Sequence, residues 1–352
     1  MTGHGGNVFL ASDETGIPVN EMLDFSASIN PLGVPESVSA VIRENIGLLV
    51  HYPEPFADSI SRDLSQQLGV PAQSLVCGNG STELIYLLVR ALRPRRVLMP
   101  GPTFSEYERA CHLNDGTSCT RFDLSPQGGF AIDPGQFVAA MAGCDMAFLC
   151  NPNNPTGRLL ERKTVLDLVR AAERAGCLLV VDEAFIDFTP DQSLVRDVEG
   201  NSHLIVLRSL TKFYALSGLR IGYGIFPDRV VQQVSAHKEP WTVNTLAQMA
   251  AATAIRDRGY QERTMEMIFE EKEYLEQGFQ DLGIAFFPSS TNYYLLRISR
   301  GNEVAASLRK RGILVRDCRN FPGLDESYIR VAVRSRNENN RLLKELGDLC
   351  AR

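Results

Sequence analysis

The sequence predicts an α/β protein with a mostly parallel sheet in a large domain and a smaller α+β domain. From about residue 75, short apolar runs alternate with amphipathic stretches. The runs expected to be strands are 96–99, 146–150, 178–181, 204–207 and 221–226. The apolar residues that recur at helical spacing are Val165, Leu168, Val169 and Ala172 in one stretch, and Leu84, Leu87, Leu88, Ala91 and Leu92 in another. Strands that alternate with helices indicate a parallel sheet covered on both faces.

A different pattern begins after about residue 245. A long helical repeat precedes short strand-like runs at 293–298, 313–315 and 329–333. Its apolar members are Met265, Ile268, Phe269, Leu275, Phe279 and Leu282. The first thirty residues are rich in Gly, Ser and Asn, which is typical of an arm rather than of a core. We therefore expect an arm over 1–30, a large domain over 31–244 and a small domain over 245–352.

Composition narrows the class of protein. The 352 residues carry 36 Lys and Arg against 42 Asp and Glu, a net charge of −6 that disfavours a general nucleic-acid binder. No apolar run is long enough to span a bilayer, and the first residues lack the layout of a signal peptide. The eight cysteines form no Cys-x-x-Cys pair and the five histidines are scattered. We expect a cytoplasmic protein with free thiols and no structural metal.

Three polar residues each follow an apolar strand: Asn154, Asp182 and Lys212. In a parallel sheet the ligand lies at the carboxyl ends of the strands, so these side chains are expected to converge. A lysine amine and a buried acid are what pyridoxal 5′-phosphate (PLP) needs for its Schiff base and its ring nitrogen. Taken singly, Lys212 reads as a surface charge, Asp182 as the partner of an arginine, and the 151–157 run as a structural turn.

Candidate phosphate ligands accompany these residues. The run from Gly78 to Glu83 joins a strand end to a helix start, where free backbone N–H groups bind anions. An ordinary helix cap is the alternative for this run. Ser209 and Arg220 flank Lys212 and are suited to a phosphate dianion.

The order Gly/Ser loop, Asn turn, Asp, Lys and Arg resembles that of the fold-type I PLP-dependent transferases, which are aspartate aminotransferase-like. The resemblance is to the histidinol-phosphate aminotransferase-like branch and runs over nearly the whole chain. It implies a large domain with a mostly parallel seven-stranded sheet. Within the branch, four stretches are similar to the decarboxylases of L-threonine O-3-phosphate: 4–7, 23–33, 182–188, and 321–324 leading to 330–335.

The resemblance implies a role for each matching residue. Lys212 and Asp182 would be catalytic, Lys212 by holding PLP and Asp182 by pairing with its ring nitrogen. The residues implied to bind the cofactor are Tyr52, Gly80, Ser81, Thr82, Phe104, Asn154, Asp182, Ser209, Lys212 and Arg220. Those implied to bind substrate are His4, Gly5, Asn30, Asn154, Arg316 and Arg330. Arg330 would take the carboxylate, and Arg316 with His4 the phosphate. Tyr52 would reach the cofactor of a second subunit, which implies a homodimer.

The implied reaction is decarboxylation of L-threonine O-3-phosphate to (R)-1-aminopropan-2-ol O-2-phosphate and CO2, in cobalamin biosynthesis. Phe185 stands where aminotransferases of the branch carry a tyrosine, which favours the decarboxylase. Ser28 stands where the decarboxylases carry an asparagine. The alternative enzyme is a histidinol-phosphate aminotransferase or a related aminotransferase. A regulator that uses this fold without catalysis would need a DNA-binding module, and no basic helix-turn-helix segment precedes residue 75.

Overall fold

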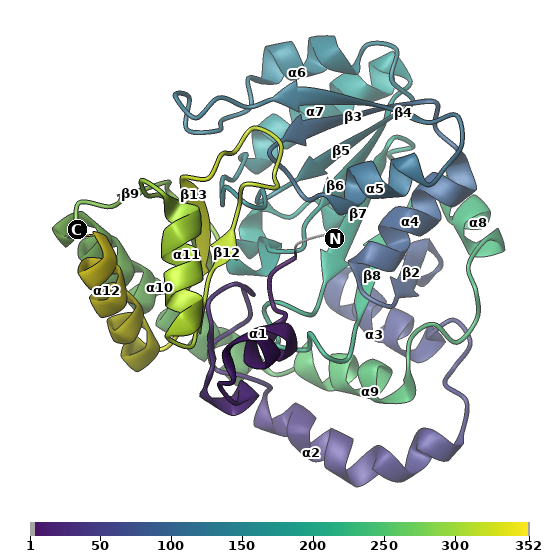
Figure 1. The fold of residues 1–352 in the computed structure, drawn as a ribbon. Helices are drawn as coiled ribbons and strands as arrows, with labels where there is room; N and C mark the ends of the chain where they lie inside the picture. Colours follow the sequence, from purple (N-terminus) through teal and green to yellow (C-terminus); the bar gives the residue numbers. More distant parts are fainter. Residues whose placement is uncertain (1–3, 351–352) are drawn as a thin grey trace.

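A seven-stranded sheet forms the centre of the large part of the molecule (Figure 1). The structure, a computed structural model, describes residues 4–350. The strands lie in the order β2-β8-β7-β6-β5-β3-β4. Their bounds are β2 (Leu75–Gly78), β3 (Arg96–Gly101), β4 (Ser118–Asp123), β5 (Met146–Cys150), β6 (Leu178–Asp182), β7 (Leu204–Ser209) and β8 (Gly222–Ile225). Each of the five expected strands is present with bounds shifted by at most two residues.

Only β8 runs against its neighbours, since it pairs antiparallel with both β2 and β7, while β7, β6, β5, β3 and β4 pair in parallel. The sheet is therefore mixed, with one reversed strand. No α-helix separates β7 from β8. The connection between them consequently stays at the carboxyl end of β7 instead of crossing the sheet.

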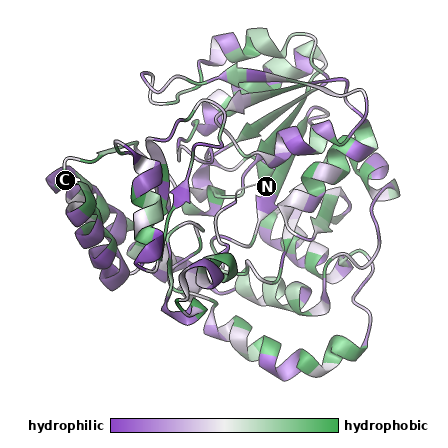
Figure 2. Ribbon diagram, viewed as in Figure 1, coloured by the Kyte–Doolittle hydropathy of each residue, from purple (hydrophilic) through white to green (hydrophobic). Residues whose placement is uncertain are grey.

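Both faces of this sheet are buried under helices because alternate strand residues point to opposite sides. In β5, Met146 and Phe148 belong to one apolar cluster, whereas Ala147 and Leu149 belong to the other. The first face is covered by α4 (Ser81–Leu92), α5 (Glu106–His112) and α8 (Asp228–Ala236). The second is covered by α3 (Asp58–Leu68), α6 (Pro134–Met141), α7 (Arg162–Ala175) and α9 (Thr245–Ala254). Figure 2 shows the strands as the most continuously hydrophobic part of the ribbon.

The second part of the molecule is a four-stranded antiparallel sheet with helices, as the sequence pattern after about residue 245 predicts. Its strand order is β12-β13-β10-β9. The strands are β9 (Ala285–Phe286), β10 (Tyr293–Arg297), β12 (Arg316–Asp317) and β13 (Tyr328–Ala332), and the helices are α10 (Arg258–Asp281), α11 (Gly301–Lys310) and α12 (Arg336–Cys350). The expected long helix is α10, although Met265 and Phe269 on it are exposed rather than buried. The division of the chain at residues 30 and 244 stays a prediction.

Residues 4–30, which the sequence assigns to an arm rather than to a core, contribute to the core. They form α1 (Val8–Thr15) and β1 (Leu23–Asp24), and β1 pairs in parallel with β11 (Ile313–Leu314). Phe25 directly after β1 is fully buried in the main apolar cluster. The pairing partner lies almost 300 residues away, so local composition gave no sign of it. A further helix, α2 (Glu36–Asn45), follows and packs against α9.

Residues 4–350 contain no helix that is long and apolar enough to cross a membrane. Across the same residues no group of three or more His, Cys, Asp or Glu side chains is arranged to hold a metal ion. All eight cysteines are free thiols.

Replacing Phe25 with Ala tests whether the first thirty residues belong to the core. Removal of a fully buried phenylalanine is expected to lower the free energy of unfolding by about 3–5 kcal/mol. Phe9 in the same segment is 71% exposed, and Phe9→Ala should change it by less than about 0.5 kcal/mol. Urea unfolding followed by circular dichroism measures both. Equal effects of the two substitutions would contradict the assignment of Phe25 to the core.

Candidate active site

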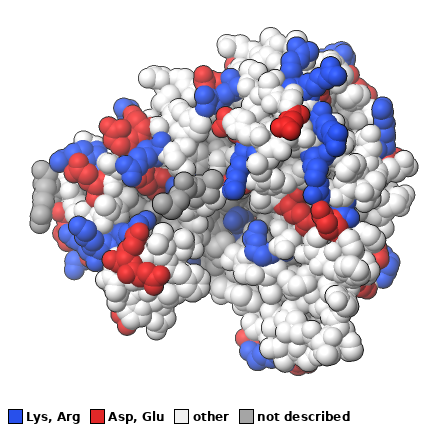
Figure 3. All heavy atoms as spheres, turned by 45° about the vertical axis from the view of Figure 1, so that its right-hand side comes forward, with Lys and Arg blue, Asp and Glu red and all other residues white. Residues whose placement is uncertain are grey.

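A cavity of about 420 Å³ opens at the carboxyl ends of the central strands, a size suited to a small cofactor with its substrate. It collects residues that are up to 326 positions apart in the chain. The predicted site residues among its lining are His4, Gly5, Ser81, Thr82, Phe104, Asn154, Asp182, Ser209, Lys212, Arg220, Arg316 and Arg330. Figure 3 shows this side of the molecule hollowed between its two lobes, with Lys and Arg atoms inside the hollow.

Lys212 lies at the base of this cavity, in the connection between β7 and β8. Burial together with the positive charges of Arg330 and Arg220 lowers the pKa of its amine to about 8. Its alternative description as a solvated surface lysine is therefore wrong. A buried amine near its pKa at neutral pH has the neutral form that attacks a carbonyl carbon.

Asp182, the last residue of β6, is 2% exposed. Its Oδ2 accepts a hydrogen bond of 2.7 Å from the Tyr107 hydroxyl, and its Oδ1 accepts one of 3.1 Å from the backbone N–H of Ala184. Burial raises the pKa of this carboxyl group, whereas the hydrogen bonds and Lys212 lower it. Within residues 4–350 no arginine pairs with Asp182, so a protonated ring nitrogen would supply the missing positive charge.

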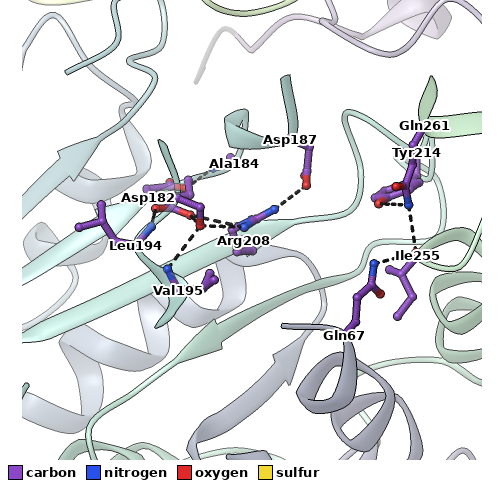
Figure 4. A network of polar contacts seen from close by, with 12 residues as sticks. Gln67, Asp182, Ala184, Asp187, Leu194, Val195, Arg208, Tyr214, Ile255 and Gln261 are labelled. Carbon is purple, nitrogen blue, oxygen red and sulfur yellow. Dashed lines mark hydrogen bonds and ion pairs between the residues drawn. The ribbon is translucent and has the colours of Figure 1, made fainter. Parts of the chain in front are cut away.

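The alternative partner of Asp182, a nearby arginine, pairs with two other acids: Arg208 contacts Glu183 and Asp187, the latter shown in Figure 4. Arg208 is buried, and its Nη1 lies 3.5 Å from Glu183 Oε2 while its Nη2 donates to Asp187 Oδ1 at 2.5 Å. Glu183 also accepts from Ser193 Oγ and from the backbone N–H of Leu194. Burial nevertheless raises its pKa to about 7. These bonds tie the end of β6 to β7 and so fix the neighbouring residues Asp182 and Ser209.

Two arginines form the opposite wall. Arg316 on β12 and Arg330 on β13 are directly opposite each other in the antiparallel register, and both are buried. Arg330 donates to Asn154 Oδ1 and, at 2.9 Å, to the carbonyl oxygen of Ser26. Its Nε is buried without a hydrogen-bond partner among the described residues. Like charges directly opposite each other destabilise a sheet, so this pair is suited to a ligand with anionic groups.

The predicted phosphate ligands lie together at the start of α4. Gly80 precedes this helix with φ +77°, and a Cβ there would lie 2.6 Å from Arg220 Nη2, so the arginine approaches the turn closely. Ser81, Thr82, Ser209 and Arg220 line the cavity at this point. Gly80 has no side chain, so the N-cap residue itself does not occupy the N–H groups at the start of α4. Such N–H groups bind anions, and the turn is therefore suited to the cofactor phosphate.

An ion pair between Lys238 and Glu83 stabilises this turn. Lys238 Nζ donates to Glu83 Oε1 at 2.7 Å and to Thr242 Oγ1 at 2.6 Å. The other carboxylate oxygen of Glu83 accepts from the backbone N–H of Asn79. Glu83 therefore orients the loop that precedes Ser81.

Phe104 and His4 lie on the rim of the cavity, with ring centroids 5.9 Å apart. Phe104 also packs edge-on against Tyr107, the residue that holds Asp182. Its implied role as a residue that binds the cofactor is compatible with this position. The roles assigned to the individual site residues stay predictions.

Three predicted residues are not among those that line the cavity: Gly80, Asn30 and Tyr52. Gly80 directly precedes Ser81, which does line it. Asn30 is buried elsewhere, where its amide donates to the carbonyl oxygen of Phe213 and to Thr264 Oγ1. Its backbone N–H donates to the carbonyl oxygen of Lys212, so Asn30 holds the lysine loop rather than contacting a substrate. Tyr52 is 85% exposed and packs against Trp241 at 5.4 Å between ring centroids.

Other residues of the site had no sequence signal. Tyr107 and Glu106 begin α5, and their partners Asp182 and His4 lie 75 and 102 positions away. Thr211 lines the cavity and shares a hydrogen bond of 2.7 Å with Ser209 Oγ. Thr211 lies between the predicted residues Ser209 and Lys212, so its position in the sequence could have indicated it as a site residue.

A buried amine of lowered pKa, a buried acid without a cation, and a cradle of N–H groups together fit PLP. They define a protein of the PLP-dependent class. The family model for aminotransferases of class I and II matches residues 20–346. The chain belongs to this family, whose cofactor is pyridoxal 5′-phosphate.

Comparison with individual proteins gives relatives of two activities. The chain is 38% identical to threonine-phosphate decarboxylase of Salmonella typhimurium, over 97% of this chain and 95% of that protein. It is 32% identical to an adenosylcobalamin biosynthesis bifunctional protein of Leptospira interrogans, over 98% of this chain but 41% of that longer protein. Among solved structures, the histidinol-phosphate aminotransferase of Clostridium acetobutylicum superposes with a TM-score of 0.88 at 31% identity, over 94% and 99% of the two chains.

The lowered pKa of Lys212 predicts how the protein without cofactor takes up PLP. Only the neutral amine reacts with the aldehyde, so the rate should rise with pH and be half-maximal near pH 8. A lysine in a short peptide, with its ordinary pKa of 10.5, serves as the control. Absorbance changes during mixing measure both rates. Half-maximal uptake near pH 10 would contradict the burial and charge effects assigned to Lys212.

Proposed function

We propose that the protein decarboxylates L-threonine O-3-phosphate to (R)-1-aminopropan-2-ol O-2-phosphate. The observation that carries the proposal is the facing pair Arg316 and Arg330 in the cavity that contains Lys212. Two buried guanidinium groups match a small amino acid with two anionic groups, a carboxylate and a phosphate. The identity to a decarboxylase of this name supports the choice of substrate.

Most of these residues would orient the substrate or the cofactor, and Lys212 would transfer a proton. PLP, when bound, supplies an electron-withdrawing ring that weakens the bonds at the substrate Cα. Arg330 would grip the carboxylate, and Arg316 with His4 the phosphate. Asp182 would hold the ring nitrogen, Asn154 the phenolic oxygen, and Ser81, Thr82, Ser209 and Arg220 the cofactor phosphate.

The contacts to the carboxylate and to the phosphate would determine the reaction, because only the Cα bond that is perpendicular to the plane of the cofactor ring breaks. In decarboxylation the bond between Cα and the carboxylate carbon breaks, CO2 leaves and Cα gains a proton. Lys212 Nζ is the group placed to deliver that proton. The same lysine would remove the Cα hydrogen if the substrate were rotated, and amino transfer would follow. A histidinol-phosphate or related aminotransferase is therefore the second candidate, favoured by the structural likeness to such an enzyme.

Phe185 supports decarboxylation over amino transfer. It lines the cavity with its ring 5.9 Å from Lys212 Nζ, at the position where aminotransferases of this branch carry a tyrosine. A phenyl ring brings no hydroxyl group to the cofactor. The name of the Leptospira relative supports a place for this reaction in cobalamin biosynthesis. A cytoplasmic location follows from the proposed reaction on a small phosphorylated metabolite.

A homodimer belongs to the same proposal. Tyr52 lies outside the cavity, within exposed apolar side chains that a monomer would leave in water. The exposed fractions are 59% for Ile46, 57% for Leu49, 81% for Val50, 49% for Phe56 and 49% for Trp241. A second subunit would cover this patch. Tyr52 of one subunit would then reach the cofactor phosphate of the other subunit.

Incubation of the PLP-loaded protein with O-phospho-L-threonine tests the reaction. We expect one CO2 for each substrate consumed and no keto acid, measured by carbonate trapping and by hydrazone formation. Keto acid without CO2 would show an aminotransferase. Lys212→Ala should reduce kcat by about 10²–10⁴-fold because proton transfer is lost. Lys344→Ala, at an exposed position of α12, is the matched control and should keep full activity.

Light scattering tests the dimer. Leu49→Glu places a charge in the exposed apolar patch and is expected to reduce the measured mass from twice 39.0 kDa to 39.0 kDa. Leu113→Glu is the matched control, since Leu113 is 71% exposed at the end of α5, apart from the patch. A wild-type protein of 39.0 kDa at micromolar concentration would contradict the dimer.

A further inference from the structure

Residues 4–6 are here called the rim segment. Its residues His4 and Gly5 line the cavity, and the segment is held on both sides. On one side His4 Nε2 lies 2.8 Å from Glu106 Oε1 on α5. On the other side the backbone N–H of Gly6 donates to Ser26 Oγ at 2.7 Å. The rim segment therefore joins a helix of the large sheet to the turn after β1.

Glu106 is built into this position. It is 5% exposed, and its Oε2 accepts a hydrogen bond of 2.5 Å from the Tyr86 hydroxyl and lies 3.6 Å from Arg109 Nη1. With Oε2 engaged, Oε1 is the oxygen that accepts from His4 Nε2. An anionic ligand needs a donor, and Nδ1 is one when both ring nitrogens carry a proton, so Nδ1–H of the protonated imidazole is the group available to a phosphate.

The other side of the rim segment also has a defined seat. A Cβ at Gly5 would collide with the carbonyl oxygen of Ser26, so only glycine allows this approach. That carbonyl accepts the hydrogen bond from Arg330 Nη2. A continuous set of contacts thus runs from Glu106 through His4 and Gly5 to Arg330, the proposed carboxylate ligand.

The rim segment is also a wall between two cavities. A second cavity of about 820 Å³ lies beside the first and is bordered by α1 and α11. His4, Gly5, Ser26 and Arg316 line both cavities. A displaced rim segment would join the two spaces and admit water to the position proposed for the substrate phosphate.

We infer that Glu106 is a positioning residue that fixes His4 and the rim segment over the substrate phosphate, so that recognition of the phosphate depends on it. The inference rests on the proposed function and names a determinant of its substrate specificity. The carboxylate of Glu106 would repel an anion bound nearby, so its presence in the site calls for a compensating role. That role is to orient His4, while Tyr86 and Arg109 engage its other oxygen.

Two other roles are distinguishable from this one. A proton-transfer role for Glu106 would lower kcat and leave ligand affinity unchanged. A purely structural role in α5 would weaken all ligands equally, because Tyr107 on the same turn holds Asp182. A positioning role changes the affinity for a phosphorylated ligand alone. The ratio of the two dissociation constants separates the positioning role from the other two. The constants themselves separate those two, since only a structural role raises both.

The experiment compares O-phospho-L-threonine with L-threonine as ligands of the PLP-loaded protein, using the initial change in cofactor absorbance on mixing. The wild type is expected to prefer the phosphorylated ligand. Glu106→Ala should reduce this preference about tenfold and leave the affinity for L-threonine unchanged. Glu106→Gln keeps an oxygen acceptor for His4 and should retain most of the preference. Glu108→Gln on the same helix is the matched control, since Glu108 does not line the cavity.

Gly5→Ala provides an independent variant, because it displaces the rim segment without altering α5. It should reduce the preference as Glu106→Ala does. An unchanged preference in both variants, an equal loss for both ligands, or a wild type without preference would each overturn the inference. Formation of keto acid instead of CO2 would refute the proposed reaction but leave this test intact, since the test measures binding rather than turnover.

Discussion

The structure depends on keeping an amine buried among other positive charges. Lys212 has Arg330 and Arg220 as neighbours, and its pKa is lowered because burial and both arginines disfavour its charged form. Such a site would be unstable without precise support. Support comes from the β7–β8 connection, which stays at one sheet edge, and from Asn30, which binds the lysine loop from outside the cavity. The rest of the large domain therefore holds in place an amine whose charged form is disfavoured.

A second set of buried charges stabilises the floor of the cavity without entering it. Arg208 neutralises Glu183 and Asp187, of which Glu183 directly follows Asp182. Among residues 4–350 no guanidinium group pairs with Asp182, and Tyr107 donates to one of its oxygens. The arrangement separates the charges that maintain the fold from the carboxylate that lines the cavity.

The sequence allowed prediction of the strands and of the residues that follow them, because apolar runs and the polar residues at their ends are local patterns. Lys212, Asp182 and Asn154, which line the cavity, were predicted in this way. Glu106 and Tyr107 could not be found, since their significance comes from partners that only the fold brings near. Asn30 was misjudged for the opposite reason: its motif is local, but its amide turns toward Phe213 and Thr264. Phe25 was placed outside the core because β1 pairs with a strand near the other end of the chain.

The floor and the rim of the cavity come from different parts of the chain. Lys212 and Asp182 belong to the large sheet, whereas Arg316, Arg330 and the rim segment belong to later strands and to the first residues. Substitutions at Arg316, Arg330 and the rim segment would change the orientation of a substrate without altering Lys212 or Asp182. Under the proposed function, gene duplication followed by such substitutions and by a change at Phe185 would turn one activity of this family into another. Relatives with different reactions at similar levels of identity are what such a history would leave.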